Sequence, residues 1–183
     1  IRKGYHPNFI GGPVLEALGL KRLEPAAKEG LCLINGTQAM GALACLAWAD
    51  ADHLTKLADV AGASSVEGHK ATATAFDERI QTARGHPGQL TCAENRRRLL
   101  EDSEIAADHA DCDQVQDAYS FRCMPQVHGA TRDVLTFARK TIEIEINAAT
   151  DNPLVFAEDD LMISGGNFHG QPIAMPMDAV VTA

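Results

Sequence analysis

The sequence predicts a mainly α-helical protein, a bundle of long helices with one small β-hairpin. Alanine is abundant and aromatic residues make up only 5% of the 183 residues, which favours closely packed helices over a β-sandwich. Two long stretches, residues 38–59 and 125–149, repeat apolar residues at three- and four-residue intervals, the period of a helix with one buried face. Two short apolar runs on either side of a charged turn predict the hairpin.

The chain before the first long helix is predicted to be mostly loop. Residues 1–12 are expected to form a loop, followed by short helices at 13–18 and 25–29. The apolar run 31–34 is expected to pack inward. Thr37 is expected to cap the helix at 38–59, because a threonine side chain can accept a hydrogen bond from the first turn.

The middle of the chain is predicted to contain three further helices. Gly62 is expected to end the first long helix, and a second helix is expected at 64–76. Further helices are predicted at 77–83 and 89–102, and residues 103–118 are predicted to form an acidic loop.

The last part of the chain is predicted to contain the second long helix, the hairpin and a final helix. Pro153 ends the long helix, since the residue before a proline avoids helical dihedrals. The hairpin is predicted from strands at 154–156 and 161–163, and the last helix begins near residue 169. Without a repeat or a low-complexity linker, we expect residues 1–183 to form a single partial domain.

Charge and hydropathy exclude several classes of partner. A net charge of −9 argues against nucleic acid, whose recognition needs a basic face. The one basic run, residues 96–98, is flanked by acidic residues and is interpreted as a solvated helix face. No apolar run is long enough to cross a bilayer, so no membrane partner is expected.

Cysteine usage indicates a reducing compartment and no metal site. The five cysteines are odd in number and form no C-x-x-C pair, which fits a cytoplasmic protein. Asp108, His109 and Cys112 could suggest a metal-binding corner. A structural site needs a second ligand pair at recognisable spacing, so we interpret this segment as an acidic loop.

Residues 113–129 are the stretch that packing explains least, because neither a helical nor a strand period places their polar groups on one face. Tyr119 and Arg122 are three residues apart, so on a helical turn their side chains would point the same way. A guanidinium binds a carboxylate through two parallel hydrogen bonds, and a phenol can transfer a proton. The pair is therefore either a carboxylate-binding site with an acid/base group, or a polar helix start with a buried tyrosine hydroxyl and a surface arginine.

Three motifs occur together in this chain: KEGLCLINGTQ at 28–38, QDAYSFRCMPQVHG at 116–129, and NAATDNP at 147–153 followed by SGGNFHG at 164–170. The combination resembles the aromatic amino-acid ammonia-lyases, and the resemblance runs nearly end to end. The residues of the second and third motifs are more similar to those of the bacterial histidine-specific members than to those of the plant phenylalanine-specific members.

The resemblance implies a helical homotetramer that shares each active site among subunits and eliminates ammonia from L-histidine to give trans-urocanate. The family's electrophile is a methylidene-imidazolone, formed from an Ala-Ser-Gly tripeptide that does not occur in this chain. Ala63-Ser64-Ser65 is no substitute, because the third residue must be glycine. We therefore expect a central segment of a longer lyase chain, inactive by itself.

The resemblance also implies roles for five residues of this chain. Asn35 matches an asparagine near the electrophile and the substrate amine, and Tyr119 matches the acid/base tyrosine. Arg122 matches the arginine that binds the substrate carboxylate. Gln116 matches a glutamine that lines the site, and Phe168 matches an aromatic that shields the electrophile.

Two alternatives stay open at this point. The parent could be a tyrosine or phenylalanine ammonia-lyase, or an aminomutase. The chain could also be a truncated, non-catalytic assembly module, for which its Ala- and Val-rich ends would provide apolar contact surface.

Overall fold

The computed structural model of the chain describes residues 11–109 and 115–183. These residues belong to two compact units, separated in sequence between Asn35 and Gly36. Helices dominate, and the described residues contain one two-stranded sheet. This confirms the predicted mainly α-helical fold with a small hairpin. The expectation of one partial domain stays a prediction.

The first unit contains two short helices, α1 (Gly11–Ala17) and α2 (Glu29–Cys32). α1 confirms the first short helix predicted from the sequence, while residues 1–10 lie outside the described part. α2 begins only at Glu29, where the predicted helix was expected to end. The reason is Lys28, whose left-handed φ of 69° is incompatible with a continuous α-helix.

The apolar run of the first unit does not pack inward as predicted. Leu33 and Ile34 are 72% and 79% exposed. Neither α1 nor α2 buries a residue, so residues 11–35 form no interior that could receive these side chains.

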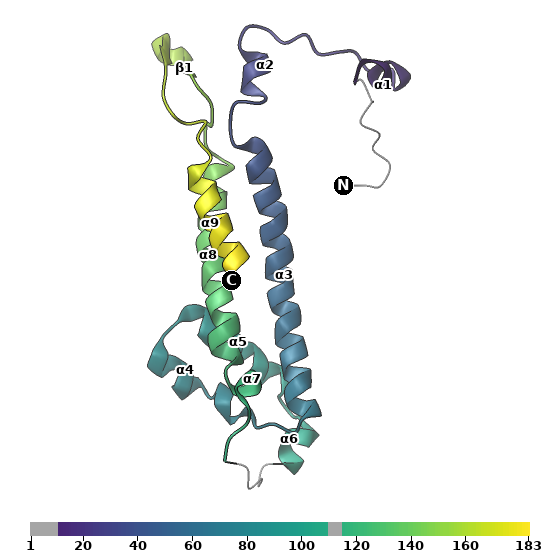
Figure 1. The fold of residues 1–183 in the computed structure, drawn as a ribbon, viewed down its shortest axis with the longest axis vertical. Coiled ribbons are helices and arrows are strands. Elements are labelled where there is room, and N and C mark those ends of the chain that lie inside the picture. The colour runs from purple at the N-terminus through teal and green to yellow at the C-terminus, as the bar shows by residue number, and fades with distance from the viewer. Residues whose placement is uncertain (1–10, 110–114) are drawn as a thin grey trace. The chain divides into compact units, whose positions relative to one another are not determined.

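Four longer helices build the second unit, and α3 and α8 run alongside each other in Figure 1. The four are α3 (Gln38–Gly68), α5 (Pro87–Leu99), α8 (Met124–Glu145) and α9 (Gln171–Thr182). α8 packs against the other three. It begins as predicted, with Pro125 in its first turn, but ends at Glu145, where the Asn147 side chain donates a 2.8 Å hydrogen bond to the Glu143 carbonyl.

Short elements connect these helices. They are η1 (Ala73–Phe76), α4 (Glu78–Arg84), α6 (Glu104–Asp108), α7 (Tyr119–Arg122), β1 (Leu154–Phe156), η2 (Ala157–Asp159) and β2 (Leu161–Ile163). β1 and β2 pair antiparallel as predicted, with Leu154 opposite Ile163. The segment predicted as an acidic loop contains α6, which the Ser103 hydroxyl caps by accepting the Ala106 N–H at 3.1 Å.

α3 is one continuous helix of 31 residues and passes through Gly62, where the sequence predicts a break. Gly62 is buried because α3 makes a close approach there. A Cβ on Gly62 would lie 2.6 Å from the Met124 sulfur and 2.9 Å from Arg96 Nη2. The separate helix predicted at 64–76 is therefore wrong: its first part continues α3, and only the 3₁₀ turn η1 follows.

A second close approach joins α5 to α8. A Cβ on Gly129 would lie 2.5 Å from both the N and the Cα of Gln89, which are backbone atoms of α5. Gly88 belongs to the same contact, and its backbone N–H donates a 2.7 Å hydrogen bond to Asp133 Oδ1 on α8. The two helices therefore cross at backbone distance.

The interior of the second unit consists of two apolar clusters. The larger contains Ala63, Val66, Ala71, Phe76, Ala93, Leu100 and Met124, and the smaller Ala44, Ile142 and Ile173. The larger cluster lies where α3, η1 and α5 meet the start of α8. It therefore supports the segment from which Tyr119 and Arg122 project.

Thr37 is buried but does not cap α3 as predicted, because no side-chain cap hydrogen bond forms. Its hydroxyl instead donates to Glu145 Oε1 at 2.7 Å, and its N–H reaches Thr150 Oγ1 at 3.4 Å. It thus ties the first residues of α3 to the end of α8.

The middle of α3 is tied to α8 by the single tryptophan. Trp48 Nε1–H donates to the Leu135 carbonyl at 2.8 Å, and the Arg139 guanidinium lies 5.3 Å from the centre of the indole ring.

Among the helices described, none combines the length and the apolarity that a bilayer-spanning segment needs.

Candidate functional site

Tyr119 and Arg122 form a stacked pair on α7. The Arg122 guanidinium carbon lies 4.5 Å from the centre of the Tyr119 ring, within cation–π range. The side chains therefore point the same way, as their spacing predicts. Tyr119 is 73% exposed, so the interpretation with a buried tyrosine hydroxyl is wrong.

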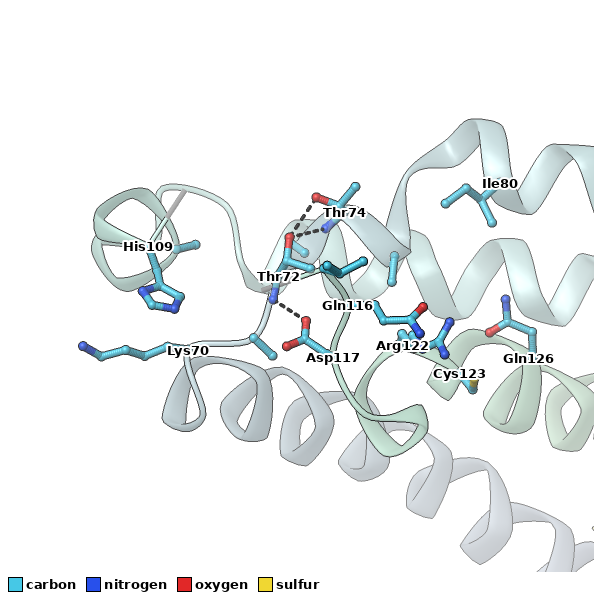
Figure 2. Close-up of a pocket in the computed structure, with 15 residues that line it drawn as sticks. Lys70, Thr72, Thr74, Ile80, His109, Gln116, Asp117, Arg122, Cys123 and Gln126 are labelled. Carbon is cyan, nitrogen blue, oxygen red and sulfur yellow. Dashed lines mark hydrogen bonds between the residues drawn. The ribbon is translucent and has the colours of Figure 1, made fainter. Parts of the chain in front are cut away.

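Arg122 also lines a cavity of about 710 Å³ beside α7 (Figure 2). Gln116 and Gln126 lie near Arg122 on one side, and Lys70 and His109 lie on the other. This volume falls within the range of small-molecule sites, roughly 300–1,000 Å³. Tyr119 is not among the lining residues, so Arg122 stands between the cavity and the exposed phenol ring.

Two polar atoms at this cavity have no hydrogen-bond partner in the described part of the chain: Arg122 Nε, a donor, and Gln126 Oε1, an acceptor. Both atoms are shielded from solvent. Leaving one such group unpaired costs about 1–3 kcal/mol, so unpaired groups in a native fold need an explanation. A ligand could supply the missing partners.

Asp117 fixes the backbone that leads into α7. Its Oδ2 accepts the Thr72 N–H at 2.8 Å, which ties residues 116–118 to the turn between α3 and η1 (Figure 2). Asp117 and Gln126 belong to the polar stretch 113–129, but no sequence pattern distinguishes them within it. Contacts between distant segments decide their roles.

Behind α7, a buried polar cluster joins α3, α5 and α8. The carboxylate of Asp59 accepts hydrogen bonds from Arg96 Nη1 at 2.8 Å and Asn95 Nδ2 at 2.7 Å, and it also pairs with Arg132. Arg96 is completely buried. The interpretation of residues 96–98 as a solvated face is therefore wrong for Arg96, because α5 turns this side chain toward Asp59.

His128 and Cys92 complete this cluster. Arg96 Nη2 lies 2.8 Å from His128 Nδ1, which identifies Nδ1 as the acceptor because a guanidinium can only donate. Burial, reinforced by the positive charge of Arg96, lowers the pKa of His128. Burial raises the pKa of the Cys92 thiol to about 11.

One possible ligand atom each from Asp59, Cys92 and His128 lies within 4.8 Å of the others, but the arrangement does not suit a cation. The Asp59 oxygens already bind two arginines, and Arg96 occupies His128 Nδ1. Two guanidinium charges would repel a metal ion. The sequence also suggested a metal site at Asp108, His109 and Cys112, and Cys112 lies outside the described residues.

Phe168 lies far from Arg122 in this chain. Phe168 sits two residues before Gly170, which approaches Met40 near the start of α3. Arg122 sits two residues before Met124, which approaches Gly62 near the end of α3. Met40 and Gly62 are separated by roughly 33 Å along the helix, at about 1.5 Å per residue.

The predicted site residues thus fall into separate groups. Gln116, Tyr119 and Arg122 lie together at α7, Phe168 follows the hairpin, and Asn35 belongs to the first unit, where it is half-buried. Their roles stay predictions.

Comparison with known proteins places the motif residues in a family context. The sequence model for aromatic amino acid lyases matches residues 9–183, which is nearly the whole chain. The chain belongs to the aromatic amino acid lyase family. This match includes the α7 segment with its stacked Tyr119–Arg122 pair.

Individual relatives agree with this assignment. The chain is 52% identical over 169 residues to a histidine ammonia-lyase of Myxococcus xanthus, covering 92% of this chain and 33% of the relative. It is 53% identical over 174 residues to that of Sorangium cellulosum, with 92% and 34% covered. The chain thus spans about a third of the length of these relatives.

Solved structures share the fold. Histidine ammonia-lyase from Trypanosoma cruzi matches with a TM-score of 0.82 and 42% identity, over 93% of this chain and 31% of that one. Tyrosine aminomutase from Streptomyces globisporus matches with a TM-score of 0.83 and 38% identity, over 93% and 36%. The helical fold is therefore that of the ammonia-lyases and aminomutases.

Proposed function

We propose that the complete protein of this aromatic amino acid lyase chain eliminates ammonia from L-histidine and releases trans-urocanate. The proposal depends on the position of Arg122, which is stacked on the exposed Tyr119 ring and lines a cavity of about 710 Å³. Identity of about half to histidine ammonia-lyases supports histidine as the amino acid.

The residues of this chain would bind the substrate and move its proton. Arg122 would hold the carboxylate, and Tyr119 would take or give a proton at its hydroxyl. Asn35 would hydrogen-bond the amine, Gln116 would line the site, and Phe168 would shield the electrophile. The elimination breaks the C–N bond and the β-C–H bond and forms a carbon–carbon double bond.

The electrophile is a separate requirement of this chemistry. A methylidene-imidazolone would supply it, and no Ala-Ser-Gly precursor occurs in these 183 residues. The donor set fits such a group: the Tyr119 phenol is open to approach, and the neighbouring guanidinium can neutralise substrate charge. Because Phe168 and Arg122 are far apart within the chain, we include in the proposal a homotetramer with shared sites. We also propose a cytoplasmic location, which the odd number of cysteines without a C-x-x-C pair supports.

The direct test is an assay of the complete protein with L-histidine, following urocanate by its ultraviolet absorbance. Arg122→Lys should lower kcat/KM by about 10- to 100-fold, since an ammonium cannot replace a two-pronged hydrogen bond. The matched control is Arg139→Lys, which alters an exposed arginine that also stacks on an aromatic ring. Absence of urocanate from the wild-type protein would reject the proposal.

An aminomutase is the second candidate, and the likeness to tyrosine aminomutase favours considering it. The same assay with L-histidine, L-tyrosine and L-phenylalanine decides between them. An aminomutase would yield a β-amino acid, whereas a lyase releases ammonia. A protein that turns over none of the three would instead fit the non-catalytic assembly module.

A further inference from the structure

The cavity beside α7 presents a complementary pair of unsatisfied groups. Arg122 Nε–H needs an acceptor and Gln126 Oε1 needs a donor, and neither atom has a partner among residues 11–109 and 115–183. The two residues are four positions apart at the junction of α7 and α8. Both residues line the same cavity.

Their chemistry selects one class of ligand. An α-amino acid carries an acceptor, its carboxylate, and a donor, its ammonium group, on the same carbon atom. Such a molecule can accept from Arg122 while it donates to Gln126. A plain carboxylate would satisfy Arg122 alone and would leave the Gln126 oxygen unpaired.

Three other polar residues at the cavity, Thr72, Thr74 and Asp117, are engaged with one another. The Asp117 carboxylate is engaged with the Thr72 N–H, and the Thr72 hydroxyl lies 2.8 Å from the Thr74 hydroxyl. Gln126 Oε1 is thus a buried acceptor beside Arg122 that remains available to an ammonium group.

We propose that Gln126 is a substrate-binding residue that recognises the α-amino group of the amino acid whose carboxylate binds Arg122. The inference rests on the proposed function for the role of Arg122. It goes further in assigning the amino group a second partner on this chain, in addition to the proposed Asn35. It also predicts that the site prefers amino acids over the same acids without an amino group.

The test compares two ligands that differ at the amino group, L-histidine and imidazolepropionate. Both are titrated calorimetrically into the complete protein carrying Tyr119→Phe, a background chosen to slow turnover. Gln126→Met keeps the length of the side chain and removes its acceptor. It should weaken L-histidine binding by about 10- to 100-fold, the effect of one hydrogen bond to a charged group, and change imidazolepropionate binding less than twofold.

Gln116→Met is the matched control, because Gln116 lines the same cavity and is not assigned to the amino group. It should leave the ratio of the two affinities unchanged. Retained imidazolepropionate binding also shows that each variant is folded. If Gln126→Met weakens both ligands equally or neither, Gln126 does not recognise the amino group and the inference is overturned.

Failure of the proposed function gives a different result. In that case the wild-type protein would produce no urocanate, while the calorimetric preference for the amino acid could still be lost in Gln126→Met. A wild-type protein that binds both ligands equally would overturn the inference whatever its activity.

Discussion

At the scale of single residues, the buried cluster around Asp59 contains more positive than negative charge. Asp59 is one carboxylate between the guanidinium groups of Arg96 and Arg132, and burial together with the charge of Arg96 lowers the pKa of the neighbouring His128. Burying charges is costly unless each has a partner. The cluster therefore stabilises the fold only while every member is present.

Removing Asp59 should be severely destabilising. Asp59→Asn should lower the free energy of unfolding by about 3–5 kcal/mol, because two buried guanidinium groups lose their counter-charge. Chemical denaturation of the complete protein measures this. Asp52→Asn is the control on the same helix, where the exposed pair with Lys56 contributes at most about 0.5 kcal/mol. Equal effects of the two substitutions would contradict the argument.

The lowered pKa of His128 predicts a pH dependence of stability. In the unfolded chain this imidazole takes up a proton near its ordinary pKa of 6.5, whereas the folded protein resists protonation. The unfolded state therefore binds more protons below about pH 6.5, and stability falls as the pH decreases through and below that value. Denaturation midpoints between pH 5 and 8 should show this loss, and His128→Gln should reduce it. A slope that survives the substitution would have another origin.

Burial should protect Cys92 from thiol reagents. With a pKa of about 11, this thiol is almost entirely protonated at pH 8, and its side chain is inaccessible. Brief alkylation followed by peptide mass mapping should modify the exposed Cys32 and leave Cys92 intact. Denaturation before alkylation should make both react. Equal labelling of the two in the native protein would show that the cluster opens.

At the scale of elements, the helical spacing of apolar residues predicts that the long helices exist but does not predict all of their ends. The sequence predicts a helix end at Gly62, but in the structure this glycine allows α3 to approach Met124 and Arg96. A glycine can end a helix or allow a second helix to pack closely, and the sequence does not distinguish the two roles. Only the position of the neighbouring helix does. The burial of Arg96 is not predicted for the same reason. A run of arginines between acidic residues is typical of a solvated helix face, and only the fold shows that Asp59 lies beside Arg96.

The crossing of α5 and α8 should not tolerate a methyl group. Gly129→Ala places a Cβ 2.5 Å from backbone atoms of Gln89, which cannot rotate away as a side chain could. We expect a loss of about 1–3 kcal/mol or more in the free energy of unfolding. Gly68→Ala is the control, since nothing lies within 4 Å of its added Cβ at the end of α3. A neutral Gly129→Ala would mean that the helices are farther apart than described.

At the scale of the whole molecule, the long helices leave large apolar side chains uncovered. Leu43, Leu46 and Leu54 on α3 are 69%, 66% and 62% exposed, and Ile144 on α8 is 71% exposed. The chain spans about a third of the length of its curated relatives. The motifs predict the family and the Tyr119–Arg122 pair, but they do not predict a complete site, because the structure places Phe168 far from that pair within the second unit.

We expect the isolated 183-residue chain to self-associate or to be only marginally stable, because exposed apolar side chains favour contact over solvation. Sedimentation velocity over a range of concentrations measures this directly. The complete protein under the same conditions is the control. A stable monomer at every concentration would contradict the expectation.

The contact between Trp48 and the Leu135 carbonyl also has a spectroscopic consequence. Because the chain contains one tryptophan, its intrinsic fluorescence reports on a single position, the middle of the α3–α8 pair. The indole is partly shielded there and lies beside the Arg139 guanidinium. Separation of the two helices would hydrate the ring and move its emission to longer wavelength. The chain thus carries a built-in optical probe of its central helix contact, one that needs no added label.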